Sequence, residues 1–339
     1  GDTFNFWNFG LSLSQYIWDF GQTTGRYRAA KETAAAQGAV EQSTTLQVIL
    51  TVRTAYFTAR AQRALLQVAH DNLANQERHL TQVQGFVSVG TRPEIDLAQA
   101  RTDRANAQVQ LIQSENAYAI AKAQLNQAMG VEGDTNYEVR DESLSEIKDE
   151  ETGGAELLEE AIKSRPDLMS LERQIAAQRL TVSAVKGAYG PSLSAGMAFT
   201  ESGVDITSLT WNWNASVNLT WPLFSGLLTY SQTKEAQAAL TAVIAQRDTL
   251  RQQVRVELEQ SRLQVRAAKA ALSAAGEALA NARERLRLAE ARYAAGVGSI
   301  IELGDAQLQA ASSAAQSVQS EYSLGSARAL LLKALGRFD

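Results

Sequence analysis

The chain has no cysteine and only four prolines in 339 residues, and aromatic residues make up just 7% of it. Without cysteine there is no disulfide framework, thiol nucleophile or cysteine-ligated metal site. The formal net charge of −5 provides no basic surface for nucleic acid. The sequence contains no run of about 18 apolar residues, so it predicts no transmembrane helix. The chain is instead rich in Ala, Gln, Leu, Glu and Arg, which favours long helices.

The sequence repeats itself at an offset of 206 residues. Segments from the start to the end of the chain match in this register: Leu125–Gly130 with Leu331–Gly336, Leu73–Asn75 with Leu279–Asn281, Gly90 with Gly296, and Trp7 with Trp213. The offset is far longer than the roughly 20–50 residues of solenoid repeats. We therefore interpret the chain as one structural unit built twice.

Most of the chain reads as long helices. Residues 23–87 contain no proline and few glycines, and a return helix is expected over 93–129. The second copy predicts helices from 228 to 295 and from about 300 to 335, and Gly-containing turns at 89–93 and 296–299 join each pair. The apolar spacing is heptad-like, with Ala where a globular core would carry Leu. Composition alone would favour an exposed antiparallel coiled coil of the spectrin kind.

Three segments read instead as strands. Residues 209–221 alternate large apolar with small polar residues, which is typical of a membrane β-strand of about 9–11 residues. Residues 192–199 alternate too and should pair with them through a loop near Gly203, and residues 7–14 alternate in the first copy. Four of the five tryptophans fall in these segments and Trp18 lies just beyond residues 7–14; all five are candidate membrane-interface residues: Trp7, Trp18, Trp211, Trp213 and Trp221. The alternative is a soluble β-sandwich core.

Between the copies, residues 131–160 carry twelve acidic side chains against only Arg140 and Lys148. This charge run indicates a solvated connection with little core of its own. A shorter helix is expected to start near Pro166 and to reach about residue 187.

Several ordered motifs resemble the outer-membrane efflux proteins, the TolC family. They are Glu156–Leu168 leading into a helix, Tyr189–Leu193 entering a strand, Trp221–Gly226 leaving one, and the paired turns at Gly90 and Gly296. The resemblance implies a mainly α fold with membrane β-strands and an internal duplication. Long antiparallel helical hairpins would form a trimeric α-barrel continuous with a transmembrane β-barrel.

In these terms the chain is expected to contain six regions. They are a β-barrel strand at 1–20, a helical hairpin at 21–130, an acidic connection at 131–165, a shorter helix at 166–188, a strand pair at 189–222 and a second helical hairpin at 223–339. The first copy lacks a counterpart of residues 155–206 and the sequence opens at Gly1 without a signal peptide, so we expect a missing first helix and strand. In a trimer, four strands per subunit would close a twelve-stranded barrel. Three strands per subunit would give only nine strands, with unpaired edges.

The resemblance implies a passive exit duct in the outer membrane of a Gram-negative bacterium, with most of the chain in the periplasm. The expected partners are two further copies of the chain, a periplasmic adaptor protein, an inner-membrane transporter and outer-membrane lipid, in an efflux or type I secretion system. No enzymatic activity, cofactor or nucleic-acid partner is expected. The alternative function is a soluble periplasmic coiled-coil scaffold, and a hydrolytic enzyme is a distant third.

By the same resemblance, the periplasmic end of the duct is closed by acidic residues and by polar links between helices. Asp96, Glu302 and Asp305 are the candidate gate residues, with Arg92 and Tyr293 as latch partners. A ring of carboxylates around a narrow axis would favour cations. The alternative for acidic residues just after a turn is that they complement a helix dipole, which we favour for Glu94.

The turns themselves are candidate adaptor-docking tips, made of Val89, Gly90, Thr91, Gly296, Val297 and Gly298. Because glycine also serves as a helix cap, the two glycines that lead the turns have a structural reason to be there as well. The two histidines, His70 and His79, are nine residues apart on one helix, which is not the spacing of a paired metal site. Both are expected at the surface.

Overall fold

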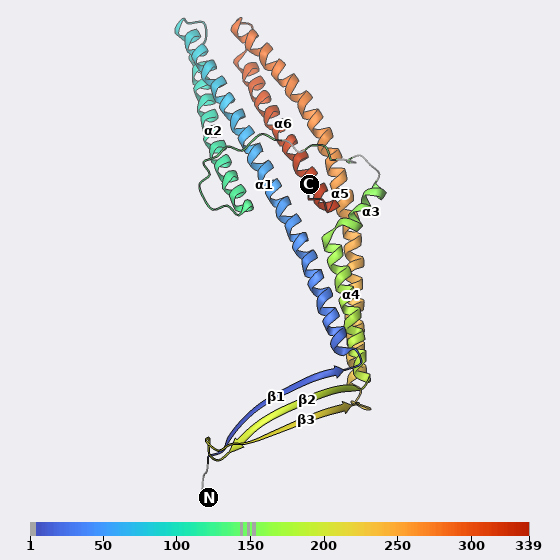
Figure 1. Cartoon of the computed structure of the whole chain (residues 1–339). Helices are drawn as coiled ribbons and strands as arrows, with labels where there is room; N and C mark the ends of the chain where they lie inside the picture. The colour runs from blue at the N-terminus through green and yellow to red at the C-terminus, as the bar shows by residue number, and fades with distance from the viewer. Residues whose placement is uncertain (1–4, 143–144, 148–149, 151–153, 339) are drawn as a thin grey trace. The chain divides into compact units, whose positions relative to one another are not determined.

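The computed structural model describes residues 5–142, 145–147, 150 and 154–338. The expected regions 1–20 and 131–165 therefore extend in part outside the described residues. In chain order the elements are β1 (Trp7–Trp18), α1 (Gln22–Ser88), α2 (Glu94–Met129), α3 (Gly154–Ser164), α4 (Pro166–Lys186), a 3₁₀ turn (Gly187–Tyr189), β2 (Ser192–Gly203), β3 (Thr210–Thr220), α5 (Leu228–Ala294) and α6 (Ile300–Leu335) (Figure 1). Within the described ranges, no helix combines the length and the apolar character required to cross a membrane.

The long helices lie where the sequence predicts them, within about a residue at most ends. The physical reason is that glycine and proline mark the boundaries. Gly130 ends α2 in the left-handed conformation, with φ of 67°, and Gly336 does the same for α6, with φ of 73°. The prediction of an internally duplicated, mainly helical fold is confirmed.

The repeat extends to backbone conformation. Eight of the residues with positive φ form four pairs at the offset of 206: Phe20 with Gly226, Gly21 with Leu227, Gly90 with Gly296, and Gly130 with Gly336. A left-handed residue is costly for any side chain with a Cβ atom, so such positions do not recur by accident. Both copies thus use the same two-residue turn between strand and long helix and the same cap at each helix end.

The chain divides into two compact units. The first unit, residues 1–42 and 166–252, contains the sheet, α4 and the adjoining parts of α1 and α5. The second unit, residues 43–165 and 253–339, contains both helix–turn–helix hairpins and the acidic connection.

The sheet of the first unit is antiparallel in the order β1-β2-β3 (Figure 1). Leu11 lies opposite Phe199, which lies opposite Trp213, and the predicted pairing of the two strands around Gly203 is confirmed. Because side chains alternate along a strand, this register gives two distinct faces. One face carries small and polar residues: Asn8, Gly10, Ser12, Ser14, Ser194, Gly196, Ala198, Thr200, Asn212, Asn214, Ser216 and Asn218. The other face carries large apolar residues that are exposed in this chain, among them Phe9, Leu11, Leu13, Met197, Phe199, Trp211, Trp213, Val217 and Leu219.

In the second unit, small residues dominate the helix contacts. The buried positions of α5 there are three, four or seven residues apart: Val254, Leu258, Ser261, Val265, Ala268, Ala275, Ala282, Ala289 and Tyr293. This is the heptad-like pattern with Ala expected from the sequence. Small side chains at these positions let neighbouring helices approach closely.

The acidic connection is more firmly attached than its charge predicts. Val139 and Ile147 are buried. Arg63 on α1 donates to the carbonyl of Val139 at 2.6 Å and to the carboxylate of Glu138 at 2.7 Å. The hydroxyl of Tyr56 donates to the carbonyl of Arg140 at 2.8 Å. The expectation of a solvated segment is met by most of its described residues, which are exposed, but residues 138–140 are also bound to α1, whose arginine and tyrosine side chains donate hydrogen bonds to them.

Candidate functional site

The candidate site lies where the two hairpins of the second unit turn. In the first tip, the amides of Gly90 and Thr91 donate to the carbonyls of Val87 and Phe86; in the second, Gly296 and Val297 donate to Tyr293 and Arg292 in the same pattern. A helix therefore ends in a left-handed cap at both tips. The next helix begins differently in each copy: the hydroxyl of Ser299 accepts the amide of Glu302 at 3.0 Å, whereas Pro93 has no side-chain cap.

Five of the six predicted docking residues lie at the surface of these tips. Val89 is 72% exposed and Val297 is 70% exposed, and Gly90, Thr91 and Gly296 are exposed as well. Gly298 is buried instead. A Cβ atom on Gly298 would lie 2.9 Å from the backbone nitrogen of Tyr293, so only glycine fits this position without a shift of the backbone.

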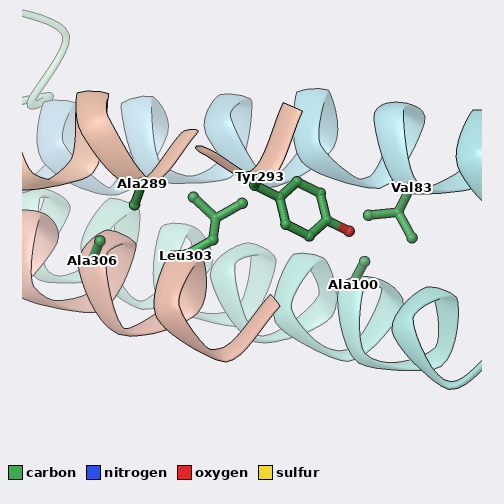
Figure 2. Close-up of a cluster of buried hydrophobic side chains, with 6 residues drawn as sticks. All are labelled: Val83, Ala100, Ala289, Tyr293, Leu303 and Ala306. Carbon is green, nitrogen blue, oxygen red and sulfur yellow. The ribbon is translucent and has the colours of Figure 1, made fainter. Parts of the chain in front are cut away.

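Below the turns, the four helices share one apolar core. Its buried members are Val83, Ala100, Ala289, Tyr293, Leu303 and Ala306 (Figure 2). Val83 and Ala289, and likewise Ala100 and Ala306, are equivalent positions of the repeat. The two hairpins of one chain thus pack side by side below their tips, through matching residues of the repeat.

Arg92 and Tyr293, the predicted latch partners, are brought together in this core. The guanidinium carbon of Arg92 lies 4.7 Å from the centre of the Tyr293 ring. The same guanidinium donates to the carbonyl of Gly298 at 3.1 Å. A cation over an aromatic face is attracted by its quadrupole, and arginine makes this contact more often than lysine. Arg92 therefore ties the first tip to the second by two contacts.

Tyr293 is only 1% exposed, and Figure 2 shows its oxygen directed toward Val83. Among the described residues its hydroxyl has no hydrogen-bond partner. Burial raises the pKa of this hydroxyl, against the opposing effect of the Arg92 charge, and the charge of Asp96 adds to the rise. The phenol is therefore neutral, and the ring rather than the hydroxyl makes the contacts.

The predicted gate carboxylates lie in three different environments. Asp96 is 8% exposed and acts electrostatically on Tyr293. Glu302 forms an ion pair with Arg292 at 3.1 Å, and Asp305 is exposed on α6. Glu94 is exposed in the first turn of α2. Over the described residues, no group of three or more acidic or histidine side chains is arranged to hold a metal ion.

Sequence reasoning missed His79. It was expected at the surface, but it is 6% exposed, and its ring centre lies 5.3 Å from that of Tyr293 at an edge-to-face angle of 64°. His70 is exposed as expected. The spacing of Gln76, His79 and Val83 places His79 on the buried stripe of α1, and this signal could have been read from the sequence.

The five tryptophans lie at the ends of the strands of the first unit. Trp7, Trp211 and Trp213 are near the turn that joins β2 to β3, while Trp18 and Trp221 are at the ends that lead into helices. All five are exposed in this chain. The indole nitrogen of Trp221 donates to the carbonyl of Tyr189 at 3.1 Å, so this indole has its polar group satisfied and its ring at the surface.

Comparison with known proteins identifies the class. The family model described as "Outer membrane efflux protein" matches residues 1–131 and 157–337. The chain belongs to this family, and the resemblance read from its motifs is confirmed.

Two members of the family are similar to this chain in sequence. The cation efflux system protein CusC of Escherichia coli is 25% identical over 230 residues, which cover 64% of this chain and 48% of CusC. The probable efflux pump outer membrane protein TtgC of Pseudomonas putida is 25% identical over 355 residues, covering 96% of this chain and 68% of TtgC. The chain thus spans about half to two thirds of the length of these relatives.

Solved structures of the family share its fold. A crystal structure of CusC matches with a TM-score of 0.85 at 20% identity, covering 98% of this chain and 78% of that one. The Campylobacter jejuni CmeC outer membrane channel matches with a TM-score of 0.83 at 19% identity, covering 98% and 71%. The open state of the Neisseria gonorrhoeae MtrE channel gives 0.79 at 18%, covering 99% and 81%.

Proposed function

We propose that this chain is the outer-membrane channel of a tripartite efflux or secretion system, and that it acts as a passive conduit without catalysing a reaction. Its family and the channel structures that share its fold support this function. The proposal places the protein in the outer membrane of a Gram-negative bacterium, with its long helices in the periplasm.

The exposed apolar face of the sheet is the observation that carries the proposal. Leu11, Leu13, Val217 and Leu219 are exposed together with the five tryptophans. An exposed apolar surface of this size marks contact with a membrane or with another protein. β1 and β3 are the outer strands of this sheet. Lipid does not tolerate unpaired strand edges, so strands of other copies should continue the sheet into a closed barrel. A homotrimer is the assembly that the proposal requires.

The partners follow from the tips. Val89 and Val297 are exposed apolar residues at two turns of equal geometry, and with Gly90, Thr91 and Gly296 they would meet a periplasmic adaptor protein, which links the channel to an inner-membrane transporter. Because Gly298 is buried, its proposed contribution is to the shape of the tip rather than to the contact.

The gate is proposed at the same tips. Arg92, Tyr293 and Asp96 would form the latch inside each chain, and Glu302 would be held back by Arg292. Asp305 is exposed and is the candidate for a ring of carboxylates around the axis of a trimer, which would favour cations.

Sequence similarity to the relatives does not identify the exported substrate. Relatives with 25–26% identity are named for the efflux of cations, of toluene and of antibiotics. A conduit needs little affinity for what passes through it, so the lining residues carry little record of the cargo.

The test is the mass of the purified protein in detergent. The proposal expects a trimer that precipitates when the detergent is removed and that re-enters lipid vesicles. A stable monomer in buffer without detergent would instead establish the soluble scaffold, the competing function.

A further inference from the structure

His79 is a buried titratable group beside the apolar core below the two turns. The contacts of Arg92 with Tyr293 and Gly298 do not involve it. It is one of two histidines in the chain, and the other, His70, is exposed on the same helix. The His79 ring packs edge-to-face on Tyr293, whose ring also lies under the guanidinium of Arg92. Phe86 touches Tyr293 as well, with ring centres 6.2 Å apart. The aromatic ring of the latch is thus held by one cation, one imidazole and one phenyl ring.

This arrangement occurs only once in the duplicated sequence. At the offset of 206 residues, Tyr293 corresponds to Val87 and His79 corresponds to Arg285. The core around them is otherwise matched, since Leu80 corresponds to Leu286 and Leu97 to Leu303. The second copy therefore has no equivalent ring pair, and the histidine is not required to build a core of this kind.

We propose that His79 is a positioning residue that makes closure of the tip depend on pH. As a neutral imidazole it packs against Tyr293 and holds the ring beneath Arg92. When protonated, it would place a second buried cation on the same ring that Arg92 already occupies, and the two hairpin tips would separate. The inference rests on the proposed channel function for its biological meaning, but the geometry on which it stands lies within one chain.

The charged groups around His79 come from several elements. Asp96 and Asp103 on α2 favour its protonated form, and Arg92 at the first turn lies over the ring of Tyr293 that His79 also contacts. Tyr293 on α5 is neutral, and α6 presents the apolar residues Leu303 and Ala306 to this core. Burial outweighs the two carboxylates and lowers the pKa of His79 below its ordinary value of 6.5.

The lowered pKa of His79 determines how closure of the tip depends on pH. A histidine that opens into water regains its ordinary affinity for a proton, so the open tip binds protons more tightly than the closed tip does. Closure is therefore complete above about pH 6.5 and weakens as the pH falls. With one proton linked to opening, the ratio of open to closed tips rises by up to about tenfold per pH unit in the window below 6.5.

The absence of cysteine from the sequence allows a direct test. Spin labels at V89C and V297C, one on each exposed tip, would report the distance between the hairpins by pulsed electron resonance in chains diluted among unlabelled copies. We expect the distance distribution to be narrow at pH 7.5 and to gain a longer component by pH 5.0. His79→Phe keeps a ring and cannot titrate, so it should remove the pH response, and His79→Gln serves as a second non-titrating variant.

His70→Phe is the matched control, since it removes the other histidine of the same helix and should leave the response unchanged. A distribution that does not change between pH 7.5 and 5.0, or a pH response that persists in both His79 variants, would overturn the proposal. A pH-dependent distance in protein that never conducts ions would uphold the role of His79 and reject the channel function instead.

Discussion

Arg92 donates a hydrogen bond to the carbonyl of Gly298, the residue that occupies its own position in the second copy of the repeat. The two tips of one chain therefore meet at equivalent positions but contribute different groups, a guanidinium and a backbone carbonyl. This asymmetry allows a hydrogen bond between the tips, because one tip supplies the donor and the other the acceptor. Two identical tips would place two cations or two carbonyls opposite each other.

Replacing Arg92 with Ala should loosen the closed tip. The change removes a hydrogen bond to a charged group, worth about 1.5–3 kcal/mol, and a cation–π contact. In planar bilayers we expect a resting conductance about tenfold or more above that of the unmodified protein. Arg287→Ala removes an exposed arginine whose ion pair with Glu284 lies within one helix turn, and it should leave the conductance unchanged. Equal effects of the two variants would contradict the latch.

Replacing Tyr293 with Phe should keep the tip closed. Because the buried hydroxyl has no partner among the described residues, its removal gives up no hydrogen bond and relieves a desolvation cost of about 1–3 kcal/mol. Tyr293→Ala removes the ring and should open the tip. The measurement is the same resting conductance, and an opening as large in the Phe variant as in the Ala variant would show that the hydroxyl holds the latch.

Asp305 should set the charge preference without setting closure. Asp305→Asn is expected to reduce the ratio of cation to anion permeability, measured as a reversal potential in a salt gradient, while the resting conductance stays low. Glu94→Gln also removes an exposed carboxylate near a tip and should alter neither quantity. The double replacement of Asp96 and Glu302 with Ala should instead raise the conductance, and no change there would reject those two as gate residues.

Gly190 should not tolerate a side chain. A Cβ atom at this position would lie 2.2 Å from the ring of Phe20, in the turn that leads from β1 into α1. Gly190→Ala is therefore expected to lower the thermal midpoint by several degrees. Gly38→Ala is the matched change, because nothing lies within 4 Å of its Cβ position, and Ala in a helix should stabilise the protein by up to about 1 kcal/mol. If both variants lowered the midpoint equally, the close packing of Phe20 on Gly190 would be refuted.

The sequence predicted the long helices and the strand pairing because local chemistry determines them. Glycine caps such as Gly130 and Gly336 end the helices, and alternation over 209–221 defines a strand and its two faces. It could not predict contacts that depend on distant residues. The acidic connection is bound through Arg63 and Tyr56 on α1, and charge counting cannot reveal such partners.

His79 illustrates the same limit. The spacing of apolar and polar residues in α1 could have placed it on a buried stripe, but not against Tyr293, which lies 214 residues further along the chain. Family resemblance predicted Arg92 and Tyr293 as latch partners of the gate carboxylates, but it did not predict the contact of Arg92 with the Tyr293 ring that the structure contains. The roles of Asp96, Glu302 and Asp305 in gating remain predictions.

The central claim is that this chain forms a closed but openable pore, and single-channel recording in planar lipid bilayers tests it most directly. We predict small, cation-preferring current steps at pH 7.5 that grow larger in Arg92→Ala. Bilayers that stay silent with both proteins, although a trimer has inserted, would contradict the account.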